Sequence, residues 1–143
     1  MRALLDINVL IALLDAAHVN HSQAMNWLEG SAHYGWASCP LTQNGCIRVM
    51  SNPGYPDPLP PALVADRLGE AADHPEHRFW PDDINLLKGD IIDWTYILSN
   101  KQITDVYLLA LAVHNQGRLI TFDRKIDLKA VSKAGKKHLL VLS

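Results

Sequence analysis

Residues 2–14 read Arg-Ala-Leu-Leu-Asp-Ile-Asn-Val-Leu-Ile-Ala-Leu-Leu, an apolar run that is interrupted at Asp6 and Asn8. The residues before Asp6 predict a short buried strand, and Val9 to Leu14 predict a helix that begins just after a sharp turn. Asp6 therefore lies where a strand passes into a helix. In an open parallel sheet, this position faces the binding crevice beyond the carboxyl ends of the strands.

A second run, Arg-Leu-Ile-Thr-Phe-Asp at residues 118–123, places Asp123 just beyond another predicted strand. Asp105 opens a periodic helix that extends to Gln116 and precedes this strand. We expect Asp6, Asp105 and Asp123 to converge on one site. Converging carboxylates raise one another's pKa unless a cation neutralises them. The pattern therefore predicts a site for Mg²⁺, with Mn²⁺ as a substitute, because both ions prefer hard oxygen ligands.

The stretch between these runs alternates between strand-like and helix-like patterns. Residues 52–61 hold five of the eight prolines and predict a loop. An alternating order of this kind predicts a small α/β sandwich with a mostly parallel sheet. The other expected elements are a helix around Ala24–Leu28, a strand at Gly35–Cys39, a helix capped by Thr42, a helix at Ala62–Ala72, a brief strand at Phe79–Trp80, short helices after Pro81 and at Ile91–Leu98, and an edge strand at His138–Leu142.

Length and composition favour one domain over residues 1–143, since 48% of the 143 residues are hydrophobic. The longest apolar stretches are too short to span a bilayer, and Asp6 comes too early for a signal peptide. We therefore expect a cytoplasmic protein with no membrane association. Cys39 and Cys46 lack the spacing of a zinc site or a disulfide framework, so buried thiols are expected.

The formal charge of −2 conceals an asymmetry along the chain. Residues 118–143 hold seven Lys and Arg against two Asp, a local charge of +5, whereas residues 1–117 hold six against thirteen Asp and Glu, a charge of −7. The basic segment could dock a phosphate backbone. An equally open interpretation is that Lys129, Lys133, Lys136 and Lys137 form a solvated surface.

Each aspartate also has a purely structural interpretation. Asp6 could cap a helix, Asp105 could favour its helix dipole, and Asp123 could end a strand with an Asx turn. The three coordinated placements favour a functional site. The seven histidines lack strand-end positions of this kind, and pairs such as His18 with His21 lack a third zinc ligand, so neither histidine catalysis nor a zinc site is expected.

Three ordered motifs carry a resemblance to a known family. They are Leu-Leu-Asp-Ile-Asn-Val-Leu-Ile-Ala-Leu from Leu4, Thr-Asp-Val-Tyr-Leu-Leu-Ala-Leu-Ala from Thr104, and Ile-Thr-Phe-Asp-Arg from Ile120. The chain resembles PIN-domain ribonucleases, most closely the VapC toxin family. The resemblance implies a PIN-like three-layer sandwich and a magnesium-dependent endoribonuclease that is the toxin of a type II toxin-antitoxin pair. It also implies a homodimer, an RNA substrate and a cognate VapB-type antitoxin.

Carried over by motif, the resemblance makes Asp6, Asp105 and Asp123 the catalytic metal ligands. The family usually has a further glutamate on the helix after the second strand, whereas this chain has Gln43 and Asn44 in that region and no carboxylate. Either amide could stand in as a neutral group, which would weaken a second metal site more than the first. The remaining candidates are Asn8 and Thr121, as donors that orient the carboxylates, and Arg48, as a contact for phosphate or for an acidic group of a partner.

Two other functions compete with this one. A haloacid dehalogenase-type phosphatase needs a second aspartate two positions after the first, and this chain has Asn8 there. The alternative that stays open is a PIN-fold module that binds RNA or a partner and whose catalysis the missing glutamate has weakened. The two surviving functions differ in whether RNA is cleaved or only bound.

Overall fold

The structure is a computed structural model that describes residues 1–143. Its centre is a five-stranded sheet in the order β3-β2-β1-β4-β5, and every neighbouring pair of strands runs parallel. The predicted parallel sheet is confirmed, with the last strand at an edge. The strands are β1 (Ala3–Leu5), β2 (Trp36–Ser38), β3 (His77–Phe79), β4 (Arg118–Thr121) and β5 (Leu139–Val141).

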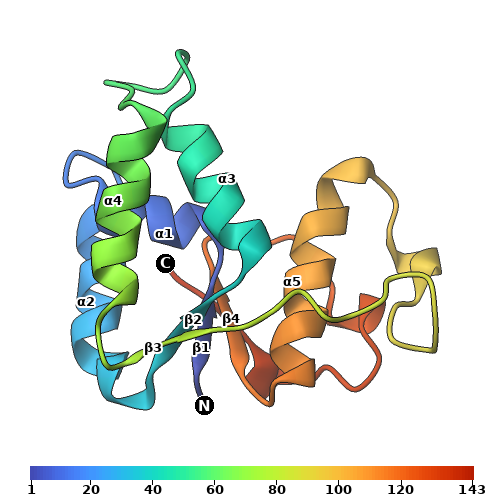
Figure 1. Ribbon diagram of the computed structural model, residues 1–143. Helices are drawn as coiled ribbons and strands as arrows, with labels where there is room; N and C mark the ends of the chain where they lie inside the picture. Colours follow the sequence, from blue (N-terminus) through green and yellow to red (C-terminus); the bar gives the residue numbers. More distant parts are fainter.

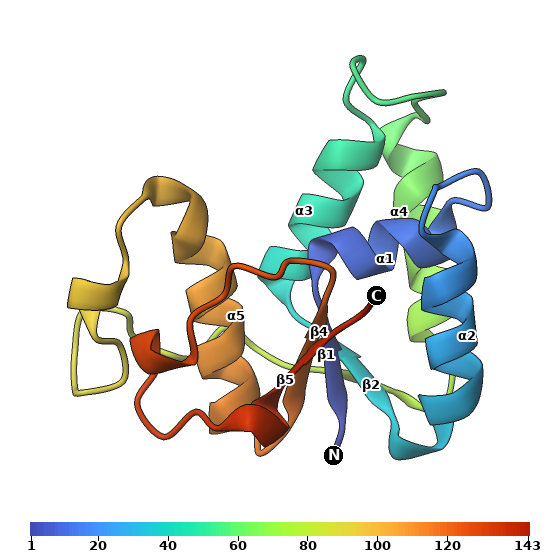
Figure 2. The same ribbon diagram turned by 180° about the vertical axis from the view of Figure 1, so that it is seen from behind.

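Helices cover both faces of the sheet and make three layers (Figures 1 and 2). One face carries α5 (Ile103–His114), and the other carries α1 (Ile7–Leu14), α2 (His21–Ser31), α3 (Pro40–Met50) and α4 (Pro61–Ala72). None of the helices combines the length and apolar composition that crossing a bilayer requires. Five single 3-10 turns complete the structure: η1 (Ala32–Tyr34), η2 (Trp94–Tyr96), η3 (Asn100–Gln102), η4 (Leu128–Ala130) and η5 (Lys136–His138).

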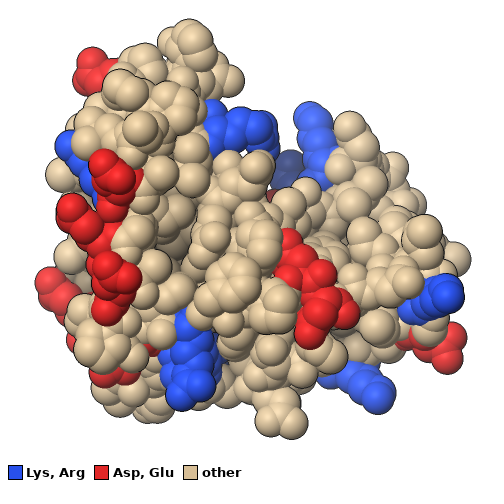
Figure 3. Space-filling view, in the orientation of Figure 1, with Lys and Arg blue, Asp and Glu red and all other residues tan.

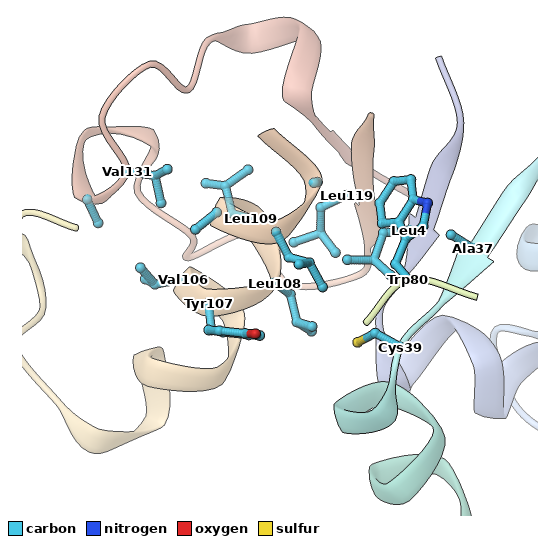
Figure 4. Packing of buried hydrophobic residues seen from close by; sticks show 14 residues of the cluster. Leu4, Ala37, Cys39, Trp80, Val106, Tyr107, Leu108, Leu109, Leu119 and Val131 are labelled. Carbon is cyan, nitrogen blue, oxygen red and sulfur yellow. The ribbon is translucent and has the colours of Figure 1, made fainter. Parts of the chain in front are cut away.

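The two faces of the sheet bury separate cores because successive strand residues point in opposite directions. Leu4 and Leu119 join the cluster formed with α5, and Figure 4 shows Leu108 of that helix beside them. Leu5 and Ile120 join the cluster formed with α1, α3 and α4. Because both faces are covered, the strands are continuous apolar runs rather than alternating ones.

The segment between β3 and α5 differs from the prediction. The helices expected after Pro81 and at Ile91–Leu98 are absent, and only the single turns η2 and η3 form there. The reason is a contact far along the chain: Ile92 forms an antiparallel bridge with Val131, and the Asp93 N–H donates to the carbonyl oxygen of Ala130 at 2.9 Å. This pairing holds the backbone extended where a helix would need its own hydrogen bonds.

Three predicted helix starts were wrong by about two residues. Helix α1 starts at Ile7, since the Asp6 carboxylate caps it. Helix α3 starts at Pro40, a residue well suited to the first helical position, and the Thr42 hydroxyl inside the first turn accepts the Cys39 N–H at 3.0 Å. Helix α5 starts at Ile103, because it continues directly from η3.

Candidate active site

Asp6 lies at the junction between β1 and α1, and both of its carboxylate oxygens are held in place. Oδ1 accepts the N–H of Ile7 at 2.7 Å, and Oδ2 accepts the hydroxyl of Thr121 at 2.6 Å. Its own N–H donates to the Ile120 carbonyl at 2.9 Å, which continues the β1–β4 pairing by one residue. The side chain is only 4% exposed. The carboxylate is therefore fixed in one orientation.

Thr121 connects this aspartate to the next one. Its Oγ1 atom accepts the N–H of Asp123 at 3.0 Å and lies 3.4 Å from Nδ2 of Asn8. Asn8 in turn accepts the N–H of Phe122 at 3.4 Å. Thr121 is fully buried. Asn8 and Thr121 therefore hold the end of β4 against the start of α1.

Asp105 lies in the first turn of α5 and shares a cavity with Asp123. The pKa of Asp105 is raised to about 7, first by burial, then by the charge of Asp6, and also by Asp123, which lies within hydrogen-bonding reach. Burial also raises the pKa of Asp6, with a smaller contribution from Asp123, against the lowering effect of its hydrogen bonds. The cavity holds about 480 Å³ and is lined by Ser99, Lys101, Gln102, Asp105, Val106, Asp123, Lys125, Ile126 and Asp127.

The chemistry of this donor set fits a magnesium or manganese ion. The donors are carboxylate oxygens, and a cation would relieve the repulsion that raises the pKa of Asp105. No group of three or more acidic, histidine or cysteine side chains is arranged to hold one ion jointly. Magnesium needs only one or two protein carboxylates and keeps several waters. Asp105 and Asp123, which share the cavity, are the pair that suits such a site.

The three candidates on α3 lie outside the cavity lining. Gln43 is half-buried, and its Nε2 atom donates to the Ser38 hydroxyl at 3.0 Å. Ser38 also lies 2.8 Å from Nε2 of His77. Asn44 and Arg48 are exposed. The amide of Gln43 is therefore engaged with the β2–β3 edge of the sheet, whereas Asn44 has a free side chain.

The basic C-terminal segment is divided by the fold. Arg118 begins β4 and pairs with Ala3, and Lys136 and Lys137 precede β5, so these cations lie at the amino ends of the strands, opposite the carboxylates. Only Lys125 of this segment lines the cavity. Lys or Arg side chains nevertheless flank both sides of the hollow that opens between α3 and α5 (Figure 3).

Three residues that were not predicted from the sequence close the cavity on the α5 side. Lys101 contributes to the lining from η3, together with Ser99 and Gln102. Ser99 accepts the N–H of Lys101 at 3.1 Å, and Gln102 accepts the N–H of Ser99 at 3.0 Å. The Ser-Asn-Lys-Gln sequence is thus a capping box, a pattern that can be recognised directly before the apolar helix.

Comparisons with known proteins agree with this architecture. The PIN domain family model matches residues 3–133. Ribonuclease VapC44 of Mycobacterium tuberculosis is 50% identical over 142 residues, which cover 99% of this chain and 100% of that protein. Ribonuclease VapC39 of the same organism is 40% identical over 124 residues, covering 86% of this chain and 89% of that protein.

A similar solved structure is that of VapBC2 from Rickettsia felis bound to a DNA fragment from their promoter. The match covers 100% of both chains with a TM-score of 0.65. Because the sequence identity is only 13%, this similarity supports the fold alone. The parallel sheet between two helical layers, its acidic residues and the family-model match together identify a PIN-type α/β protein. The chain belongs to the PIN-domain family, and within it to the VapC toxins.

Proposed function

We propose that this protein is a magnesium-dependent endoribonuclease, with manganese as a substitute, and the toxin of a type II toxin-antitoxin pair. Residues 1–143 would act as one PIN domain. The observation that carries the proposal is the buried Asp6, fixed by two hydrogen bonds beside Asp105 and Asp123, in a chain half identical to a ribonuclease. Two carboxylates at strand ends and a third in the first turn of α5, close enough for their charges to raise the pKa of Asp105, favour a functional site suited to phosphodiester hydrolysis.

The carboxylates have different tasks in this proposal. Asp105 and Asp123 line the cavity and would hold the ion, while Asp6, which is more buried and fixed by Ile7 and Thr121, would add the negative charge that already acts on Asp105. When bound, Mg²⁺ activates a water molecule, orients the scissile phosphate and neutralises charge that develops on its oxygens. Lys101 and Lys125 line the same cavity and would attract the substrate's phosphates.

A neutral amide where the family usually has a glutamate would limit the number of metal ions that the site binds tightly. Asn44 is exposed and free of side-chain partners, so it is the better substitute, whereas Gln43 is committed to Ser38. A neutral amide binds a hard cation less strongly than a carboxylate does. We therefore propose one tightly held ion. The second candidate function, a PIN-fold module that binds RNA or a partner without cutting, rests on this same missing charge.

The expected partners follow from the family. The similar structure from Rickettsia felis is of VapBC2 bound to a DNA fragment from their promoter, and we propose from membership of the VapC family that a VapB-type antitoxin binds and inhibits this protein. Homodimer formation is also proposed from the family. Arg48 on the exposed face of α3 is available for an acidic group of a partner or for a substrate phosphate.

The test is cleavage of total cellular RNA by purified, antitoxin-free protein in EDTA, Mg²⁺ or Mn²⁺, with new 5′ ends mapped. Asp6→Asn and Asp105→Asn proteins, shown to be folded, are the controls. Discrete cuts that require both the metal and the aspartates support the proposal. Uncut RNA that still binds the folded wild-type protein would instead support the binding module.

A further inference from the structure

The irregular segment between β3 and α5 exposes two aromatic rings a few residues before the part of the chain that lines the carboxylate cavity. Trp94 and Tyr96 belong to η2 and are 45% and 40% exposed. Large aromatic side chains are usually buried in a core or in an interface, and these two are only partly buried. In Figure 1 the segment lies beside α5, on the side of that helix away from α3 and α4. Its exposed rings have no role in the fold described so far.

The backbone under these rings is rigidly held. Asp93 caps η2 by accepting the Thr95 N–H at 3.1 Å, and its own N–H is bonded to Ala130 at 2.9 Å. Ile92 and Ile97, on either side of the turn, pack onto the α5 core. The rings are thus presented by a fixed turn and not by a loose loop, which lowers the entropy lost on binding a ligand.

Two links join this turn to the cavity. Along the chain, Tyr96 is followed within a few residues by Ser99, Lys101 and Gln102, which line the cavity. Through space, η2 packs against η4, which directly follows the lining residues Ile126 and Asp127. Both links place η2 next to segments that line or adjoin the carboxylate cavity.

The charges along this surface favour a polyanion. Lys101 and Lys125 line the cavity, and Lys129 is exposed on η4. Asp93 and Asp127 each accept a backbone N–H of their own turn, and the ion proposed above would neutralise Asp105 and Asp123 in the cavity. Aromatic faces that alternate with cations are typical of surfaces that bind single-stranded nucleic acid.

We propose that Trp94 and Tyr96 form a base-stacking platform for the unpaired strand that carries the scissile phosphate. The inference rests on the proposed ribonuclease function and adds how the substrate is held. Successive phosphates would lie along Lys101 and Lys125, while bases next to the cleavage point stack on the two rings. Stacking tolerates any base but favours those with large faces, so the platform selects unpaired RNA and prefers purines.

The test is the affinity of Trp94→Ala, Tyr96→Ala and the double variant for fluorescein-labelled oligoadenosine and oligouridine in Mg²⁺, each made in an Asp6→Asn background that prevents cutting. We expect about a tenfold loss for each ring, larger for oligoadenosine. Trp94→Phe, which keeps a stacking face, should retain most of the affinity. Tyr34→Ala removes a ring that is 59% exposed ahead of β2, at the amino end of the sheet, and should change nothing.

Cleavage of the same oligonucleotides by the ring variants in the otherwise wild-type chain separates the two proposals. A raised KM with kcat nearly preserved supports the platform. Normal binding and cleavage by folded ring variants would overturn the platform and leave the nuclease intact. Ring-dependent RNA binding by a wild-type protein that never cuts would overturn the nuclease and keep the platform. Ring variants that bind RNA normally but lose a dimer or an antitoxin complex would assign the rings to a protein interface.

Discussion

The hydroxyl of Thr121 donates to Oδ2 of Asp6 across 2.6 Å, joining the end of β4 to the start of α1. The same oxygen accepts the N–H of Asp123 at 3.0 Å. One fully buried side chain thus sets the relative positions of two acidic residues that are 117 positions apart in the sequence. Asp6 is the more buried of the two, and the hydrogen bond from Thr121 stabilises its ionised form, which burial disfavours.

Replacing Thr121 with valine removes the hydroxyl but keeps the shape. The ionised Asp6 then loses a donor inside the protein, so we expect a loss of about 1–3 kcal/mol in unfolding free energy at pH 7, measured in urea. Protonation of Asp6 lessens the penalty, so the deficit should shrink at pH 4. Thr121→Ser restores the donor and should recover most stability and cleavage. A valine variant as stable as wild type, with a deficit only in the serine variant, would show that the methyl group, and not the hydroxyl, matters.

Asp105 should make the metal-free protein less stable as pH rises. Its pKa is raised from the ordinary 3.8 to about 7, so between these values the folded state binds more protons than the unfolded state, and stability falls with increasing pH. Asp105→Asn removes this dependence. We expect the variant to equal wild type near pH 4 and to exceed it near pH 7.5 by on the order of 1 kcal/mol, discounted because the group is only half-buried.

The measurement is chemical unfolding in EDTA across this pH range, followed by the same series in Mg²⁺. The ion should stabilise wild type more than Asp105→Asn at neutral pH, because it binds the ionised carboxylate. Asp66→Asn changes an exposed carboxylate on α4 and serves as the control. A stability difference between Asp105→Asn and wild type that does not vary with pH would refute the proposed role of repulsion at this site.

The placement of Asp6 and Asp123 could be predicted from the sequence because each follows a local apolar run. Strands that are joined through a helix usually run parallel, so the carboxyl ends of both strands, and the aspartates that follow them, lie at the same end of the sheet. The irregular segment could not be predicted in this way. Its shape depends on pairing between Ile92 and Val131, and nothing in the local pattern of either residue signals the other.

The positions of the basic side chains relative to the cavity could not be predicted from the sequence for a similar reason. Lys125 reaches the cavity while Lys136 and Lys137 lie at the other end of the sheet, because the chain runs back along η4 and η5 before it enters β5. Lys101, outside the basic segment altogether, completes the cavity. The strand register and the paths of the loops determine which basic side chains lie near the carboxylates. Neither can be predicted by counting the charges in a segment of the sequence.

Lys101 and Lys125 should act through phosphates and not through base identity. We expect Lys101→Ala and Lys125→Ala to weaken binding of every oligonucleotide by a similar factor. Each change should also make the slope of log affinity against log salt shallower by about 0.7, the value for one phosphate of a single strand. Lys88→Ala, an exposed cation outside the cavity, should change neither quantity. A loss confined to one base sequence would indicate base recognition instead.

A side chain at Gly117 should clash with its neighbours and displace β4, which carries Thr121 into the active site. A Cβ atom there would lie 2.6 Å from the carbonyl oxygen of Arg2 and 2.6 Å from the ring of Trp80. That carbonyl also accepts the Arg118 N–H at 2.9 Å, so the clash falls where β4 begins pairing with β1. We expect Gly117→Ala to cost about 2 kcal/mol in unfolding free energy and to reduce cleavage, because β4 carries Thr121 towards Asp6.

The matched control is Gly69→Ala in α4, where an added Cβ meets nothing within 4 Å. That substitution should stabilise the protein by about 0.5–1 kcal/mol, since alanine favours a helix more than glycine does. Urea unfolding of the two variants, with cleavage measured on the folded fractions, tests the pair. If Gly117→Ala proved as stable and active as Gly69→Ala, the close packing of β1, β4 and Trp80 would not be what aligns the two aspartate-bearing strands.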